Sequence, residues 1–432
     1  METFDYIIVG GGTAGCILAA RLSEDPRHSV LLLEAGGPDN GFWIPIPAGF
    51  SKLLSGAAFN WRFTTEKEEN TGNREIVVPR GKGLGGSTLI NGMIYVRGQP
   101  QDYDGWAQRG ATGWSAADVL RYARNPDYNG PDQAGFGYYQ VNQKDGRRWT
   151  VVDAYLRPAL GRPNLKVITH AHALKLEFEG RRASGVRYRR GGKDLVARAR
   201  GEILLTAGAV QSPQLLELSG IGHPDTLAAA GLPVFHALNG VGNNYRDHFA
   251  TRMNWRVKLP ITLNEQTRGL NLARAVAQYF LTRTGILTLG TGLAHGFVKT
   301  RPELETPDIQ YFFMHASYAN AADRALDHLP GMTIGVTQLR PQSIGSIHVK
   351  SADPFAQPSI RPNFLAVQED CDSLVGGMKI ARAIIAQKAM DPYRAYEMNP
   401  GPDVQSDAQW LDFARTTGQT IYHPIGTCAM GT

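Results

Sequence analysis

Three glycines near the start of the chain have the spacing of a dinucleotide-binding turn. Gly10, Gly12 and Gly15 follow the apolar run Tyr6-Ile7-Ile8-Val9 and precede a segment with helical spacing. Such glycines allow a tight turn, a close approach of the backbone to a pyrophosphate, and close packing of helix on strand. Glu34 ends the next apolar run, 19 residues after Gly15, where a carboxylate can accept hydrogen bonds from a ribose. The sequence therefore predicts a site for the adenosine diphosphate half of NAD or FAD.

Two further glycine-containing segments could contact the same ligand. The run from Gly83 to Ser87 is rich in glycine, so its backbone N–H groups are open to a ligand. Asn91 adds an amide that could hydrogen-bond the edge of a ring of the cofactor. A buried strand over 202–206 runs into Gly208. We expect these segments to converge on one cofactor.

Three segments resemble the glucose-methanol-choline (GMC) oxidoreductase family. Residues 81–98, with Asp104 beyond, resemble the first signature of the family at every constrained position, and residues 208–222 resemble the second. Residues 422–431 resemble its active-site segment, in which a histidine faces the reactive edge of the flavin. The resemblance covers nearly the whole chain. It implies FAD-dependent oxidation of an alcohol to an aldehyde or ketone, with O2 or another compound as electron acceptor.

The same resemblance makes His423 the catalytic base. Imidazole is the side chain whose ordinary pKa lets it accept a hydroxyl proton near neutral pH, while the flavin takes the hydride. Seven other histidines lie outside such a motif and are expected to be surface or core groups: His170, His172, His236, His248, His295, His315 and His348.

The resemblance also implies which residues contact FAD. They are Gly10, Gly12, Thr13, Ala14, Gly15, Glu34, Ala35, Arg80, Gly83, Gly85, Gly86, Ser87, Asn91, Gly92, Met93, Ile94, Ala173, Ala207, Gly208, Tyr422 and His423. Some relatives attach the flavin covalently through a histidine immediately before the asparagine of the first signature. Ile90 stands at that position, so we expect non-covalent FAD.

The elements that position these residues predict an α/β fold, α+β overall. Tyr6–Val9, Ala14–Leu22 and Val30–Leu33 read as strand, helix and strand of a parallel sheet covered on both faces. Between about Leu259 and Pro362 the pattern is mixed and alternating, which favours a substrate-binding domain built on an antiparallel sheet. We expect a Rossmann-like FAD-binding domain over 1–150 and 151–250, the substrate-binding domain over 251–365, and a return to the FAD domain over 366–432.

Composition excludes several other classes of protein. The net charge is +6, and its densest part, the arginines and lysine from Arg181 to Arg200, lacks aromatic stacking positions interleaved in the way a nucleic-acid surface would need, so no nucleic-acid partner is expected. No stretch of about 18 apolar residues occurs, which predicts no membrane span. Cys16, Cys371 and Cys428 lack paired spacing, which indicates neither a disulfide framework nor a metal site and favours a cytoplasmic location.

Two places depart from the family pattern. Relatives continue for several dozen residues beyond the histidine segment, with a second His or Asn beside the base, whereas this sequence ends at Thr432, so we expect a truncation there. Two segments that lie far apart in relatives follow each other directly at Arg124 and Asn125. We therefore expect that a stretch of the substrate-side wall is missing here.

The substrate and the oligomeric state stay open. Choline, sugars, and aromatic, heterocyclic or aliphatic alcohols all fit, with a slight preference for aromatic or heterocyclic primary alcohols because Tyr311, Phe312, Phe313 and His315 are candidates for the pocket wall. The alternatives are a choline or aliphatic alcohol dehydrogenase using a non-oxygen acceptor, an NAD-dependent dehydrogenase, and a non-catalytic flavin-binding relic.

Overall fold

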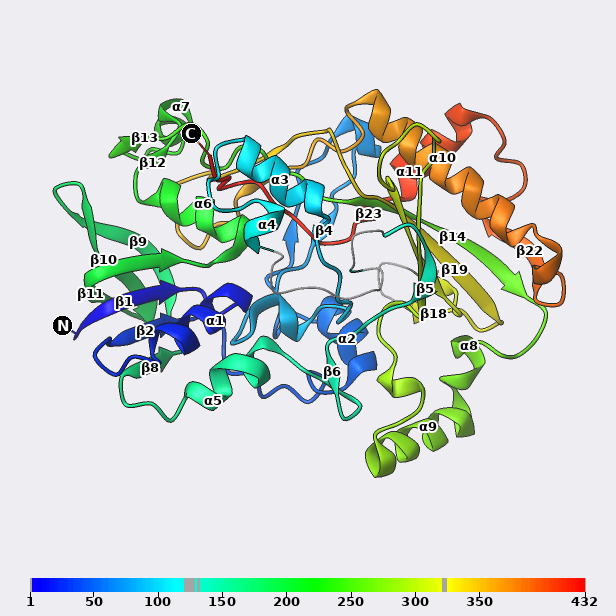
Figure 1. Cartoon of the computed structure of the whole chain (residues 1–432), viewed down its shortest axis with the longest axis horizontal. Helices are drawn as coiled ribbons and strands as arrows, with labels where there is room; N and C mark the ends of the chain where they lie inside the picture. Colours follow the sequence, from blue (N-terminus) through cyan, green and yellow to red (C-terminus); the bar gives the residue numbers. More distant parts are fainter. Residues whose placement is uncertain (1, 120–128, 130–132, 321–324, 432) are drawn as a thin grey trace.

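The computed structural model describes residues 2–119, 129, 133–320 and 325–431. Two sheets organise this part of the chain, one on the left of Figure 1 and one on the right. Because the first sheet is largely parallel and the second antiparallel, the expected mixed fold with a dinucleotide-binding unit and an antiparallel sheet is confirmed.

The first sheet has six strands in the order β8-β2-β1-β11-β10-β9. Their bounds are β1 (Glu2–Val9), β2 (Val30–Leu33), β8 (Leu165–Ile168), β9 (His172–Glu179), β10 (Arg182–Arg190) and β11 (Lys193–Leu205). The first four strands in that order are parallel, and β10 and β9 extend the sheet as an antiparallel hairpin pair. The predicted strands at 6–9 and 30–33 and the strand at 202–206 are confirmed.

Helices cover both faces of this sheet. Ile8 and Leu32 pack under α1 (Thr13–Leu22), while Ile7 and Leu31 pack toward Leu215 of α6 (Gly208–Leu218). Alternate residues of each strand are therefore buried on opposite faces, which explains the uninterrupted apolar runs in the sequence.

The second sheet has the strand order β22-β14-β19-β16-β15-β5, with β23 beside β14, and all its pairs are antiparallel. The bounds are β5 (Gly135–Tyr138), β14 (Phe249–Val257), β15 (Ala294–Val298), β16 (Ile309–Met314), β19 (Gly331–Gln338), β22 (Arg394–Asn399) and β23 (Gln419–Thr420). Strand β5 comes from the segment expected in the FAD domain, and β22 and β23 come from the segment expected to return to it. The chain thus crosses between the two sheets more often than the expected boundaries imply, and those boundaries stay a prediction.

One face of the second sheet is covered by two helices, α10 (Gln368–Ile385) and α11 (Asp407–Thr417). The N-terminus of α11 carries a capping box: the Ser406 Oγ accepts a hydrogen bond from the Gln409 N–H (3.3 Å), and the Gln409 Oε1 accepts from the Ser406 N–H (3.0 Å). Trp255 and Trp410 fill the core between sheet and helices. The opposite face of the sheet is left to line a cavity.

The remaining elements are short or peripheral. The helices are α2 (Phe50–Ser55), α3 (Pro100–Gln108), α4 (Ala116–Val119), α5 (Arg157–Ala159), α7 (Pro224–Ala229), α8 (Leu263–Gln266) and α9 (Gly269–Thr282). Two-stranded pairs are formed by β3 (Phe63–Thr64) with β4 (Val77–Val78), β6 (Gln143–Lys144) with β7 (Arg147–Arg148), β12 (Ile221–Gly222) with β13 (His236–Ala237), β17 (Tyr318–Asn320) with β18 (Ala325–Leu326), and β20 (Ser346–His348) with β21 (Ser359–Arg361). Within the described ranges, none of the helices is both long and apolar enough to cross a bilayer.

Helix α10 packs closely against the sheet at Gly377, which makes a stability prediction possible. A Cβ on Gly377 would lie 2.9 Å from side-chain atoms of Ile309 and Val336, whereas a Cβ on Gly376 would lie 3.2 Å from the Thr300 side chain. Overpacking costs about 1–3 kcal/mol, and alanine gains about 1 kcal/mol over glycine inside a helix. We expect the Gly377→Ala variant to have a lower melting temperature than the Gly376→Ala variant in thermal unfolding. Equal melting temperatures would contradict the close helix-on-sheet packing.

Candidate functional site

Two adjoining cavities lie between the sheets. The narrow cavity, about 260 Å³, is lined by the glycine-rich turn after β1 and the start of α6, and the wide cavity, about 600 Å³, is lined by residues 90–94 and by the second sheet. Arg80 and Ser87 line both cavities, so the two adjoin at these residues.

Most residues expected to contact the cofactor line this space. The narrow cavity is lined by Gly10, Gly12, Thr13, Ala14, Glu34, Ala35, Gly86, Ala173, Ala207 and Gly208, the wide cavity by Asn91, Gly92, Met93, Ile94, Tyr422 and His423, and both by Arg80 and Ser87. Gly15, Gly83 and Gly85 line neither cavity. Gly15 instead permits close packing, since a Cβ there would lie 1.9 Å from the Gly10 carbonyl oxygen, and the Gly85 N–H donates to the Gly11 carbonyl (2.7 Å).

The backbone at Gly12 and Gly208 is open toward the narrow cavity. The nearest atom to a Cβ on Gly12 would be the Gly86 Cα at 4.0 Å, and a Cβ on Gly208 would meet nothing within 4 Å. Gly12 is the N-cap of α1 and Gly208 begins α6, so two helix N-termini converge on this cavity. Exposed N–H groups and two helix dipoles suit the negative charge of a pyrophosphate.

Glu34 braces the turn as well as lining the narrow cavity. Its Oε2 accepts a hydrogen bond from the Gly11 N–H (2.8 Å) and its Oε1 accepts from the Gly36 N–H (2.8 Å). Burial raises the pKa of this carboxyl group, and the backbone donors partly oppose that effect. The expected contact between Glu34 and a ribose stays a prediction.

A buried arginine that the sequence analysis missed orients Asn91. The Arg148 Nη1 donates to the Asn91 Oδ1 (2.7 Å) and to the Asn91 carbonyl (2.8 Å), and burial lowers the pKa of Arg148 to about 10. The Asn91 Oδ1 also accepts from the Met93 N–H (3.1 Å). The carbonyl end of the amide is therefore committed within the protein, and its N–H₂ end is the part suited to a ligand. Arg148 is 57 residues away in the sequence and belongs to no motif.

His423 stands on a loop held by a buried carboxylate. The Asp247 Oδ1 accepts from the His423 backbone N–H (2.9 Å), and its Oδ2 accepts from the hydroxyls of Thr420 and Tyr245. The Arg80 Nη1 donates to the Tyr422 carbonyl (2.5 Å) on the other side of the loop. Two long-range contacts thus fix the Tyr422–His423 peptide unit, directly before the imidazole.

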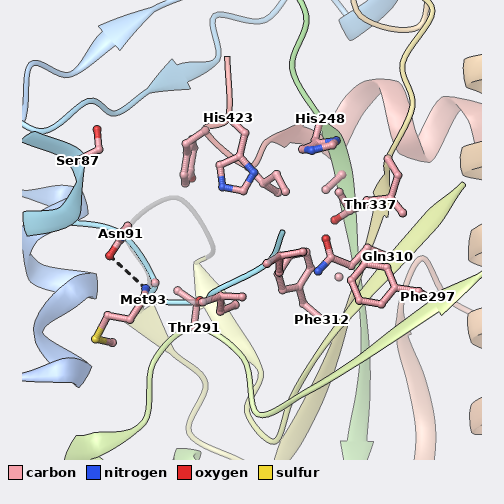
Figure 2. A pocket seen from close by; sticks show the side chains of 18 of the residues that line it. Ser87, Asn91, Met93, His248, Thr291, Phe297, Gln310, Phe312, Thr337 and His423 are labelled. Carbon is pink, nitrogen blue, oxygen red and sulfur yellow. Dashed lines mark hydrogen bonds between the residues drawn. The ribbon is translucent and has the colours of Figure 1, made fainter. Parts of the chain in front are cut away.

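A second imidazole, that of His248, lies beside His423 at the top of the wide cavity in Figure 2. The ring centroids are 5.6 Å apart and the planes are nearly perpendicular. The His248 Nδ1 lies 2.8 Å from the Gln338 carbonyl, which can only accept, so Nδ1 carries the proton and Nε2 of the neutral ring is an acceptor. The sequence analysis assigned His248 no part in the site. Its adjacency to Asp247, just before β14, is the only local signal.

Both histidines are kept neutral by their surroundings. The surface of the His423 ring is open to the cavity, but the ring lies deep among protein atoms, and this burial lowers its pKa to about 3, helped by His248 and Arg80. Burial also lowers the pKa of His248, although Asp247 opposes the effect. An imidazole without a proton on one nitrogen is the form that can accept one.

The second sheet supplies the wall facing Ser87 and Asn91 (Figure 2). Of the four candidates named from the sequence, Phe312 lines the wide cavity, whereas Tyr311 and Phe313 belong to the core under α10, and His315 is not among the lining residues. Side chains alternate along β16, so neighbouring aromatics face opposite sides. Across the described ranges, no group of three or more His, Cys, Asp or Glu residues could hold a metal ion.

Comparison with known proteins gives two family models, both described as GMC oxidoreductase. One matches residues 4–125 and 122–250, and the other matches residues 341–432. The two pieces of the first match meet where the sequence analysis expects a missing stretch; Arg124 and Asn125 lie outside the described residues, and that expectation stays a prediction.

Among the similar proteins are two dehydrogenases. An oxygen-dependent choline dehydrogenase of Chromohalobacter salexigens is 39% identical, over 99% of this chain and 86% of its own length. An alcohol dehydrogenase (acceptor) of Pseudomonas putida is 37% identical, over 99% of this chain and 86% of its own length.

Solved structures agree in fold. Pyridoxine 4-oxidase from Mesorbium loti superposes with a TM-score of 0.87 at 26% identity, over 99% of this chain and 89% of that one. A formate oxidase superposes with a TM-score of 0.90 at 23% identity, over 99% of this chain and 88% of that one. This similarity supports the fold alone.

The open backbone at Gly12 predicts a variant that folds but loses its ligand. The side chain of Gly12→Val would enter the narrow cavity without meeting the protein closely, so we expect unchanged far-ultraviolet circular dichroism and loss of most flavin absorbance after purification. Gly161→Val, at an exposed site with nothing within 4 Å, is the matched control. Full flavin retention in Gly12→Val would contradict the assignment of the cavity.

Proposed function

We propose that this chain, which belongs to the GMC oxidoreductase family, holds FAD non-covalently across both cavities and oxidises an alcohol to an aldehyde or ketone with His423 as base. The observation that carries the proposal is the neutral His423 imidazole, placed in a cavity that adjoins the one lined by the glycine-rich turn after β1. The names of the two dehydrogenase relatives support O2 or another compound as the electron acceptor.

The residues present fit FAD. The open backbone of Gly12 and Gly208 suits the pyrophosphate, and Ser87 and the N–H₂ group of Asn91 suit the rest of the cofactor toward the wide cavity. Ile90, 2% exposed, stands where a covalent attachment would need a histidine, which supports dissociable binding. Bound FAD supplies the hydride acceptor.

The protein's part of the reaction is to place and deprotonate the hydroxyl group. His423 accepts the hydroxyl proton of the alcohol, while Asp247 and Arg80 hold the loop so that the ring faces the cavity. The second sheet encloses the rest of the substrate. We also propose a cytoplasmic location, supported by the three cysteines, which are free in the described chain.

Replacing His423 tests its role as the base. We expect His423→Gln to retain FAD but to reduce it more slowly by about two to four orders of magnitude, the usual effect of losing a general base. Stopped-flow absorbance after anaerobic mixing with an alcohol measures this rate. His236→Gln, which changes an exposed histidine on β13, is the control and should reduce normally. An unchanged rate in His423→Gln would remove the residue from its role.

The lowered pKa of His423 predicts an unusual pH profile. An ordinary histidine, with a pKa near 6.5, would lose its base form as the pH falls through that value, whereas His423, with a pKa of about 3, keeps it. We expect kcat/KM to stay level between pH 7 and about pH 5 in steady-state assays. A fall in kcat/KM centred near pH 6.5 that disappears in His423→Gln would contradict this environment.

A further inference from the structure

Helix α9 turns an apolar face away from the protein. Its inner side is marked by Ala275 and Tyr279, the two buried residues of the helix, and the Tyr279 hydroxyl donates to the Pro45 carbonyl (3.4 Å). With about 3.6 residues per turn, the opposite side carries exposed apolar residues only: Leu270 (76% exposed), Ala273, Ala277 and Leu281 (83%). Figure 1 shows α9 at the lower right, projecting away from both sheets. A surface helix ordinarily carries polar residues on this side.

Aromatic side chains widen this face along one edge. Val276 and Phe280 are exposed and follow next around the helix, and Phe280 stacks on Phe42 with ring centroids 6.5 Å apart. Trp43, also exposed, meets Phe42 edge to face at 5.0 Å. We call these exposed apolar residues of α9, together with Phe42 and Trp43, the apolar ridge. Exposed apolar side chains gathered in one place mark a contact with another molecule.

Basic residues border the apolar ridge on α9 itself. Arg274 lies at its edge, and Arg283 ends the helix with its guanidinium over the Phe280 ring, 5.6 Å from the ring centroid. Within the described part of the chain, no carboxylate forms an ion pair with either arginine. The sequence has no aspartate or glutamate over 40–65 or 266–302, the ranges that contain the ridge. Both charges are therefore available to an anionic partner.

A neighbouring hairpin adds to this charge. The turn between β6 and β7 packs on the C-terminal end of α9, because a Cβ on Gly146 would lie 2.0 Å from the Arg283 carbonyl oxygen. The hairpin carries two exposed basic residues, Lys144 and Arg147, and one exposed carboxylate, that of Asp145. The border of the ridge is thus basic on balance.

The acidic residues that precede the two ranges are engaged within the protein. Asp39 forms an ion pair with Arg157 (2.5 Å). Glu265 accepts from the Thr262 hydroxyl (2.6 Å) in the capping box of α8. Neither carboxylate pairs with the arginines of α9, so the basic border of the ridge is retained.

An anionic lipid surface fits both the apolar ridge and its border. An amphipathic helix in the plane of a bilayer inserts its apolar side chains and places basic residues among the anionic headgroups, and tryptophan is favoured at that boundary. With 14 residues, α9 is shorter than the about 20 that cross a bilayer. An isologous contact between two copies would place the basic borders against one another, which disfavours it.

We propose that the apolar ridge docks this protein on an anionic lipid bilayer, with Phe280 and Leu281 inserted among the acyl chains and Arg274 and Arg283 at the headgroups. The contact is peripheral, since one short helix inserts from the side. None of the residues of the ridge lines either cavity, so docking leaves the proposed active site accessible to its own ligands. The cytoplasmic leaflet carries anionic lipids, which agrees with the proposed location.

Flotation of the purified holoenzyme with vesicles tests the lipid contact. One set of vesicles contains phosphatidylcholine alone, and the other contains equal parts of phosphatidylcholine and phosphatidylglycerol. Each basic residue near an anionic surface strengthens binding about fivefold, so we expect at least about tenfold tighter binding to the anionic vesicles, with a preference that added salt weakens. A protein that stays unbound, or that binds both kinds of vesicle equally, would overturn the proposal.

A double variant locates the contact on the apolar ridge. Burial of one leucine side chain changes an equilibrium by about tenfold or more, so Leu270→Gln with Leu281→Gln should weaken vesicle binding by at least that factor. Leu195→Gln with Leu238→Gln is the control, since both leucines are about equally exposed to each other and belong to β11 and the segment after β13, on the other side of Figure 1. Equal loss of binding in the two double variants would overturn the assignment to the ridge.

A single substitution tests the charge at the edge of the ridge. Arg274→Gln should weaken binding to the anionic vesicles about fivefold and leave binding to phosphatidylcholine vesicles unchanged. Arg181→Gln removes the same charge from an exposed turn before β10 and should bind both as the parent does. Equal anionic binding in the two variants would overturn the role of Arg274.

Sedimentation without vesicles distinguishes a lipid surface from a second copy of the chain. We expect the parent and the variant with Leu270→Gln and Leu281→Gln to have the same oligomeric state at every concentration, with equal far-ultraviolet circular dichroism because both leucines are exposed. A concentration-dependent association of the parent that this variant loses would assign the ridge to a second copy and overturn the lipid contact.

Discussion

The buried carboxylate of Asp247 is the contact on which the proposed active site depends. A carboxylate without partners is costly inside a protein: burial raises the pKa of Asp247, and the His423 N–H and the hydroxyls of Thr420 and Tyr245, which donate to it, oppose that effect. The same residue is covalently next to His248. Asp247 therefore holds the backbone at His423, while the ring of its neighbour His248 is held by the Gln338 carbonyl.

This contact also joins the two halves of the site. Asp247 leads into β14 of the second sheet, while His423 follows β23, which pairs with β14. The histidine loop is thus set against the second sheet, and Arg80, which lines both cavities, holds it from the side of the glycine-rich segments. As a result, the His423 imidazole lies where the proposed cofactor site meets the side of the wide cavity that the second sheet forms.

Local signals made part of this site predictable. The turn at Gly10, Gly12 and Gly15 is built from a strand, a tight turn and a helix that are contiguous in sequence, so its position and open backbone could be foreseen. The family resemblance placed His423 on the histidine segment, and the structure puts this residue in the wide cavity.

Other features depend on pairing between distant segments and could not be read from the sequence. The contact of Arg148 with Asn91, the proton position on His248, and the face on which Phe312 lies all follow from tertiary packing or strand register. Strand β5 joins the second sheet because β15 would otherwise present an unpaired edge on that side. No sequence motif marks that pairing.

Anaerobic titration of the purified protein with alcohols, followed by flavin absorbance, tests the central claim most directly. The account predicts a yellow protein whose flavin can be released by denaturation alone and is bleached by at least one alcohol. A flavin that no alcohol bleaches, or a protein that binds no flavin, would contradict it.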